Sequence, residues 1–293
     1  MSREPTALAR IASDFAESRV ALAGLVLLAL VLLAAVLAPL ASPQNPYDLA
    51  QLDLLDSRLP PGSKSATGMT YWLGTDDQGR DMLSGILYGL RISIGVGVAS
   101  TLCALAIGLA LGLAAGYVGG RTDTLIMRLA DLQLSFPSIL IALVLLALLG
   151  RGLDKIVVAL VAVQWAYYAR TVRSSALVER RKEYIEAAAG LALSHARIVL
   201  RHLLPNCLPP LIVVAAVQLA SAIALEATLS FLGLGLPITE PSLGLLIANG
   251  YNYLLSGKYW ISVFPGVALL LAIASINLVA DQLRDVLNPR LQR

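Results

Sequence analysis

Three carboxylates stand close together in a polar stretch of the chain, where Asp76, Asp77 and Asp81 lie within six residues of one another. Carboxylate oxygens are preferred ligands of Ca²⁺, so this group could hold a cation. The spacing does not match an EF-hand loop, however. The structural alternative is a turn over Asp76 to Gly79, followed by a short amphipathic helix that Asp81 caps. We expect the structural turn and no bound metal.

A second set of polar side chains lies inside strongly apolar stretches. Glu226 is the most unusual of them. Gln164 and Tyr168 belong to a polar and aromatic patch in an earlier apolar stretch. If these stretches cross a membrane, such groups are costly unless they face a cavity or a partner. We name all three as candidates for a translocation path or its gate. For Glu226 the structural alternative is pairing with a basic residue such as Arg91.

Motifs for catalysis and nucleotide binding do not occur in the sequence. It contains no Gly-x-x-x-x-Gly-Lys-Ser/Thr phosphate loop, no His-Glu-x-x-His and no convincing catalytic pair of serine and aspartate. Its two cysteines, Cys103 and Cys207, allow neither a disulfide framework nor a Cys-x-x-Cys metal site. We therefore expect a non-catalytic chain that binds no cofactor of its own.

Composition places these residues in an all-α integral membrane protein. The 293 residues are 57% hydrophobic and 14% charged, and the mean hydropathy is +0.75. A helix needs about 20 mostly apolar residues to cross a bilayer. Windows of that kind predict six transmembrane helices, the fourth extending to Thr171 if its polar end is in the membrane: Val20 to Leu40, Ile92 to Tyr117, Leu132 to Leu149, Ile156 to Tyr168, Leu208 to Leu232 and Ile261 to Ala280.

The distribution of basic residues predicts the orientation. A secretory signal peptide is the rival interpretation of the first window, but its 21 apolar residues are too long and no small-x-small cleavage site follows cleanly. With the N-terminus inside, 15 Lys and Arg residues are cytoplasmic and 6 are outside, with Arg91 at the boundary. Both termini are therefore expected in the cytoplasm. The basic residues form no single stripe, which argues against nucleic-acid binding.

Small residues follow one face of the second predicted span. Gly108, Gly112 and Gly116 recur at four-residue spacing. Such a face allows helix backbones to approach closely. We expect it to pack against another helix, within this chain or in a second subunit.

The largest cytoplasmic segment, residues 173–206, is alanine-rich and favours a helix up to Leu193. Ser194 is a suitable N-cap for a second short helix ahead of Pro205. Two short helices with a small-residue surface suit insertion into a groove of another protein. Contact with anionic lipid is the alternative, because Arg180, Arg181 and Lys182 adjoin the segment. Composition alone does not choose between them.

The stretch from Glu186 to Asn206 resembles the EAA loop of membrane subunits of binding-protein-dependent ABC importers. Its matching residues are Glu186, Ala187, Ala188, Leu204 and Pro205. The resemblance implies a coupling helix that docks in a cleft of an ATPase subunit. It also implicates Gly190 and Ala192, because Ala192 stands where the family has glycine and Gly190 lies two positions early. If the bend needs a positive φ angle, Ala192 costs about 1 kcal/mol; otherwise the break moves toward Gly190 or uses a negative φ angle.

A longer stretch, from Trp72 to Ser93, resembles the Leu-Gly-Thr-Asp-x-x-Gly-Arg-Asp signature of the dipeptide, oligopeptide and nickel branch of these permeases. The resemblance implies a first helix and outer loop over residues 1–88. A type I permease core would follow over 89–283, with the coupling loop at 173–206, and a cytoplasmic tail over 284–293. Together the two similarities cover almost the whole chain.

The resemblance also implies an assembly in the bacterial inner membrane. Its members would be this chain, a second similar permease, two ATPase subunits that bind ATP and Mg²⁺, and an external solute-binding protein. Membrane lipid would surround it. The expected cargo is a di- or oligopeptide, with glutathione or nickel complexes as alternatives. An ion-gradient-driven transporter is the rival from another class, but the six windows show no obvious inverted repeat.

Overall fold

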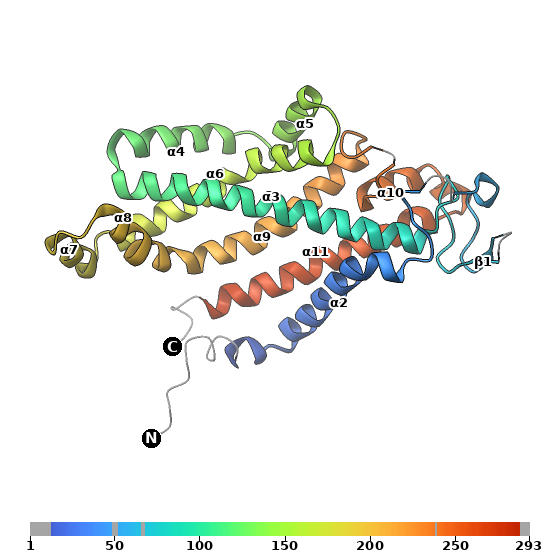
Figure 1. Ribbon diagram of the computed structural model, residues 1–293, viewed down its shortest axis with the longest axis horizontal. Coiled ribbons are helices and arrows are strands. Elements are labelled where there is room, and N and C mark those ends of the chain that lie inside the picture. Colours follow the sequence, from blue (N-terminus) through green and yellow to red (C-terminus); the bar gives the residue numbers. More distant parts are fainter. Residues whose placement is uncertain (1–12, 49–51, 66–67, 238, 288–293) are drawn as a thin grey trace, which may run out of the picture.

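The computed structural model describes residues 13–48, 52–65, 68–237 and 239–287, and helices dominate it (Figure 1). The expected tail before residue 13 and the last six residues of the expected tail 284–293 lie outside the described residues. The principal helices are α2 (Arg19–Ala41), α3 (Met82–Val118), α4 (Gly120–Leu134), α5 (Ser138–Leu149), α6 (Leu153–Glu179), α7 (Glu183–Gly190), α9 (Leu204–Phe231), α10 (Leu243–Tyr251) and α11 (Trp260–Val286).

Among the described residues, four helices are long and apolar enough to cross a membrane: α2, α3, the continuous helix His195–Phe231 and α11. The pair α4 and α5 makes up to five if it counts as one span bent by 92°. The third expected window, Leu132 to Leu149, was therefore wrong as one straight helix. Pro137 disfavours helical backbone at the residue before it, so the chain breaks between Leu134 and Ser138.

The fourth expected window lies in α6, which is not among the four candidates. Gln164 lies near the middle of this helix, and Arg170 and Arg173 make its second half polar. Its first half is apolar and packs in a buried cluster with α3, α5 and α9 through residues such as Leu160 and Val163. The number of six spans stays a prediction.

The expectation of close helix packing at the small-residue face is confirmed within the chain. A Cβ on Gly112 would lie 2.6 Å from the Ala169 carbonyl oxygen of α6, and a Cβ on Gly116 would lie 2.7 Å from Ala176 Cβ. Gly108 approaches α6 equally closely, at Tyr168. Only glycine permits this separation, so α3 and α6 lie side by side with their backbones nearly in contact.

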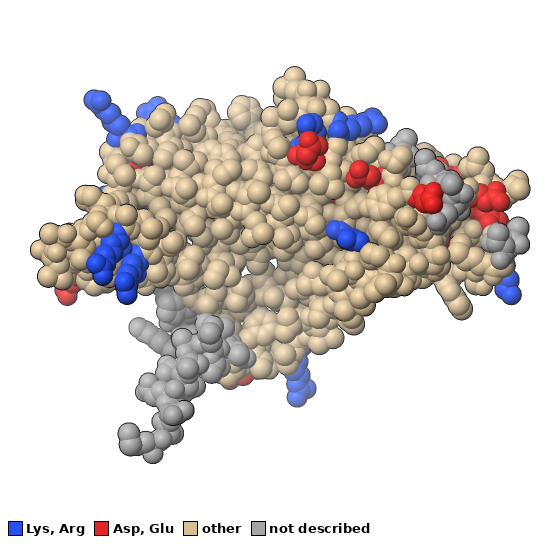
Figure 2. Space-filling view, in the orientation of Figure 1, with Lys and Arg blue, Asp and Glu red and all other residues tan. Residues whose placement is uncertain are grey.

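The two ends of the bundle differ in structure. One end carries α7, and α2 begins and α11 ends toward that side (Figure 1). The opposite end carries α10 and a hairpin of β1 (Ser63–Lys64) and β2 (Thr70–Tyr71), which are antiparallel. Figure 2 shows a surface that is mostly uncharged between the ends. Exposed side chains such as Val36 and Leu30 of α2 fit contact with lipid.

Candidate functional site

The expected coupling segment contains α7 and continues through the short helices α8 (His195–Arg197) and η3 (Ile198–Leu203). The Ser194 hydroxyl accepts a hydrogen bond from the Arg197 amide at 3.4 Å, as expected of an N-cap. The second helix is not short, however, because it continues without a break from His195 to Phe231. Pro205 therefore lies inside this continuous helix, directly after the π-helical stretch Ile198–Leu203, where the regular α-helical hydrogen bonding is already altered.

Ala192 supplies the bend after α7. Its φ angle is +55°, in the left-handed region that glycine adopts most easily. The Leu193 amide donates to the Ala188 carbonyl at 3.2 Å, and the Ala192 amide donates to the Ala189 carbonyl at 2.9 Å. These two bonds form a Schellman motif with alanine at the position usually taken by glycine. The bend therefore stays at the family position and does not move to Gly190.

The expected coupling residues do not share one environment. Glu186, Ala187, Gly190 and Ala192 are exposed, while Ala188 packs inward against Ile185 and Ile198. Leu204 is half-buried and Pro205 is exposed at the start of α9. Leu191 was missed by the sequence analysis, although 76% of its surface is exposed at the tip of the bend. The available signal was an apolar side chain next to Ala192, the position where the family has glycine.

Polar contacts attach this segment to the bundle. The Tyr117 hydroxyl, at the end of α3, lies 2.6 Å from His195 Nδ1. Arg180 Nη1 donates to the Tyr117 carbonyl at 2.9 Å. Asn206 Nδ2 donates to the Tyr184 hydroxyl at 3.1 Å, and that hydroxyl donates to Glu179. Burial, reinforced by Glu179, raises the pKa of Tyr184 to about 12, so it remains a protonated donor. Through these contacts, a movement of α7 would displace residues at the ends of α3, α6 and α9.

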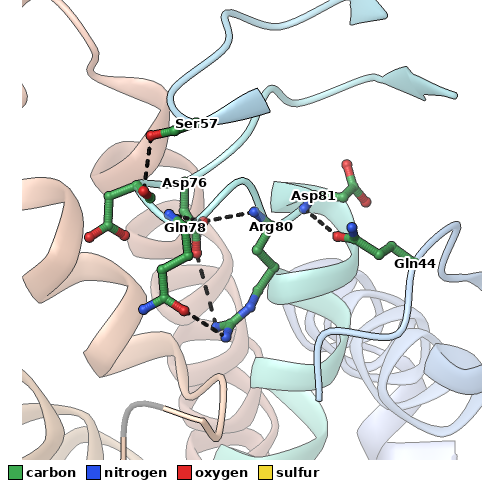
Figure 3. A network of polar contacts seen from close by, with 7 residues as sticks. Gln44, Ser57, Asp76, Gln78, Arg80 and Asp81 are labelled. Atoms are coloured by element: carbon green, nitrogen blue, oxygen red, sulfur yellow. Dashed lines mark hydrogen bonds and ion pairs between the residues drawn. The ribbon is translucent and has the colours of Figure 1, made fainter. Parts of the chain in front are cut away.

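A buried polar network occupies the opposite end, between the hairpin and the start of α3 (Figure 3). Asp76 is 0% exposed and Arg80 is 1% exposed. Asp76 Oδ1 accepts hydrogen bonds from the amides of Gln78 and Arg80, both at 2.9 Å, and Asp76 Oδ2 lies 4.0 Å from Arg80 Nη1. Burial is the main cause that raises the pKa of Asp76 to about 6, against the opposing charge of Arg80. The expected structural turn is confirmed.

The same network closes onto the first and last long helices. Gln44, just after α2, accepts a hydrogen bond from the Asp81 amide at 2.8 Å, and Asp81 Oδ2 accepts from the Ser84 amide at 2.8 Å (Figure 3). Trp260 Nε1 of α11 donates to the Thr75 carbonyl at 3.1 Å. Asp81 therefore caps α3, as expected, but this helix is 37 residues long.

The three acidic residues of the signature do not converge on a cation. Asp76 faces Arg80 and Asp81 caps α3, so their oxygens serve different partners. In the part of the chain that the structure describes, no group of three or more His, Cys, Asp or Glu side chains could hold a metal. The geometry is that of a scaffold.

The candidate path residues lie inside the chain. Glu226 and Tyr168 are 0% exposed and Gln164 is 3% exposed. Glu226 Oε2 accepts from Ser93 at 2.7 Å and Oε1 accepts from Ser230 at 2.8 Å, so its described partners are serines and not Arg91, which is exposed. Gln164 Nε2 donates to the Gln218 carbonyl at 2.9 Å. In this conformation none of the three touches a surface that a solute could follow.

Comparison with known proteins fits this architecture. Residues 108–293 match the family described as binding-protein-dependent transport system inner membrane component, and residues 6–61 match the N-terminal transmembrane domain of oligopeptide transport permease C. The chain belongs to this permease family. The permease is therefore an inner membrane component of a transport system, and the resemblance inferred from its two motifs is confirmed.

Relatives of the permease cover nearly its whole length. A peptide transport system permease protein of Brucella suis is 41% identical over 92% of this chain and 87% of its own length. The di/tripeptide transport system permease protein of Pseudomonas aeruginosa is 36% identical over 98% and 94%. The oligopeptide transport system permease protein of Bacillus subtilis is 35% identical over 95% and 88%.

A solved structure confirms the fold. A chain of the inward-facing methionine ABC transporter MetNI matches with a TM-score of 0.57 and 21% identity, over 71% of the permease and 98% of that chain. The type I importer fold expected from the sequence is therefore the fold of the permease.

Proposed function

We propose that the permease moves peptides across the inner membrane as one of two membrane subunits of an ATP-driven importer. The single observation that carries this proposal is the exposed face of α7 at one end of the bundle. Because the sequence contains no ATP-binding motif, the energy has to come from a partner, and this face is available to contact it. The names of the relatives support peptide cargo. Glutathione and nickel complexes remain the alternatives for the cargo.

The proposed partners are a second permease, two ATPase subunits and an external solute-binding protein. ATPase closure would act on the exposed residues Glu186, Ala187 and Leu191. The hydrogen bonds of Tyr117 with His195 and of Asn206 with Tyr184 would carry that movement to α3 and α9. Alternating access then requires that the loaded binding protein bind one state of the assembly more tightly than the other, because a ligand without such a preference shifts no equilibrium.

The test is co-purification of the ATPase subunits with the wild-type permease and with Glu186→Arg, followed by ATPase activity with the binding protein present. Glu186 is exposed on α7, so the reversed charge leaves the fold intact and disturbs only the docking surface. We expect loss of association or of stimulated hydrolysis. Asp154→Arg, an exposed reversal at the start of α6, is the matched control.

Peptide cargo is tested separately, by uptake of labelled dipeptides, glutathione and nickel into vesicles that contain the complete assembly. Uptake of dipeptides alone supports peptide cargo.

In the co-purification test, full association and full hydrolysis with Glu186→Arg would mean that α7 does not dock the ATPase.

A further inference from the structure

A cavity of about 290 Å³ opens beside α10, at the end of the molecule opposite α7. Its walls come from the signature loop, the α5–α6 connection, the end of α9 and α10. Apolar side chains form part of the wall, and the polar residues that line it are Asp77, Arg151, Ser230, Asn249, Asn252 and Tyr253. This volume lies at the lower limit for small-molecule sites, which are about 300–1,000 Å³.

Two residues that line the cavity each hold one buried side-chain atom that lacks a hydrogen-bond partner among the described residues. The atoms are Asp77 Oδ1, an acceptor, and Asn249 Nδ2, a donor. Leaving such groups unpaired costs about 1–3 kcal/mol each. Since both residues line the cavity, a ligand with a donor and an acceptor of its own would find an unsatisfied side chain at each.

Other groups of the wall are already held in place. Ser230 donates to the buried Glu226 carboxylate at 2.8 Å, and the Arg58 guanidinium lies 5.3 Å from the centre of the Tyr253 ring. Asp77 is fixed by its backbone, because its carbonyl oxygen accepts from the Ser57 hydroxyl at 2.9 Å. The Asp77 side chain is therefore free of any part in the turn that carries it.

The cavity also presents one charge of each sign. Asp77 and Arg151 both line it, and within the described residues neither takes part in an ion pair. A carboxylate suits an ammonium group and a guanidinium suits a carboxylate, through charge-assisted hydrogen bonds. A ligand with both ends charged meets this requirement. A nickel ion does not, because one carboxylate without histidine or cysteine is a poor ligand set for it.

We propose that this cavity is a binding subsite for a short zwitterionic peptide, with its ammonium group at Asp77, its carboxylate at Arg151 and a backbone carbonyl at Asn249. The subsite rests on the proposed transport of peptides and specifies where the permease itself contacts its cargo. The small volume limits the occupant to a dipeptide or to one of similar size. The free ends of the peptide, not its side chains, provide the recognition.

The experiment measures binding of labelled dialanine, N-acetyl-dialanine and dialanine amide to the assembled transporter in lipid nanodiscs without its binding protein. The variants are Asp77→Asn and Arg151→Gln. The matched controls are Asp154→Asn and Lys155→Gln, which change the same charges in an exposed ion pair next to Arg151 but outside the cavity. Dipeptide uptake by the complete assembly is measured in parallel.

We expect wild type and both controls to bind dialanine about tenfold more tightly than either blocked form, as one lost charge-assisted contact implies. Asp77→Asn should lose the preference for a free amine only, and Arg151→Gln the preference for a free carboxylate only. Wild type that binds no dialanine, or variants that keep both preferences, would overturn the subsite while uptake leaves peptide transport standing. Absence of uptake in wild type overturns the proposed function, and the subsite with it.

Discussion

At the α7 end, motif residues such as Glu186 and Ala187 are exposed, whereas at the opposite end Asp76 and Arg80 are 0% and 1% exposed. Both sets belong to sequence signatures of one permease family. At the α7 end, the side chain of Glu186 makes no hydrogen bond within the described residues. At the opposite end, hydrogen bonds join the signature loop to α3 and α11. Burial, and not the strength of a motif, distinguishes the proposed docking surface at α7 from the scaffold at the other end.

The largest expected effect comes from removing the buried cation at the scaffold end. Arg80→Ala leaves the Asp76 carboxylate buried without its counter-charge, and breaking a buried pair costs about 3–5 kcal/mol. We expect a large drop in melting temperature and in the yield of folded permease, measured by fluorescence-detected size exclusion in detergent. Lys64→Ala, an exposed residue of β1, should leave both unchanged. Equal behaviour of the two variants would contradict the scaffold.

The next effect is a dependence of stability on pH at the same end. The pKa of Asp76 is raised from 3.8 to about 6, so the folded state binds this proton more tightly than the unfolded state. The free energy of unfolding should therefore fall as pH rises from about 4 to about 6, by an amount on the order of 3 kcal/mol.

Melting temperatures of wild type and Asp76→Asn across this pH range check that slope. Asparagine keeps the acceptor oxygen for the Gln78 and Arg80 amides but cannot ionise. The slope should be smaller in the variant. If the plots of melting temperature against pH were parallel for the two proteins, the pH dependence would belong to other titrating groups.

A smaller effect is expected at the bend after α7. Ala192→Gly removes the Cβ that is disfavoured at a φ of +55° and should stabilise the segment by about 1 kcal/mol. Hydrogen exchange of the Leu193 amide, which closes the Schellman motif, reports this locally. Gly190→Ala is the reciprocal variant: position 190 is helical, with nothing near an added Cβ, so it should also stabilise α7. Faster exchange in Ala192→Gly would argue against the left-handed bend.

The smallest effect on stability should come from Leu191→Ala. This side chain is 76% exposed, so its loss should change the unfolding free energy by no more than about 0.5 kcal/mol. Association with the ATPase subunits should weaken nevertheless. A variant that melts earlier but keeps its association would make this end a scaffold too, and the comparison would fail.

Much of the fold could be predicted because the apolar stretches are long and uninterrupted. The first expected window, Val20 to Leu40, lies within one residue of each end of α2. Pro137 carried the signal for the break between α4 and α5, but a hydropathy window averages over it. The turn at Asp76 was readable because it is made by residues adjacent in sequence.

The environment of the path candidates could not be read in this way. Ser93, which donates to Glu226, is 133 positions away in the chain, and nothing local to Glu226 indicates it. Tyr168 is buried because glycine brings α3 against it, which depends on the packing of two helices. The peptide subsite likewise joins Asp77, Arg151 and Asn249 from three separate segments.

The glycine face of α3 also limits how the importer can move. With Gly112 and Gly116 pressed against α6, the two helices have no clearance to slide past each other. We therefore expect them to move together, with any hinge elsewhere, in connections such as the one between α4 and α5. Distances between spin labels on α3 and α6 should stay constant through the transport cycle while other pairs change.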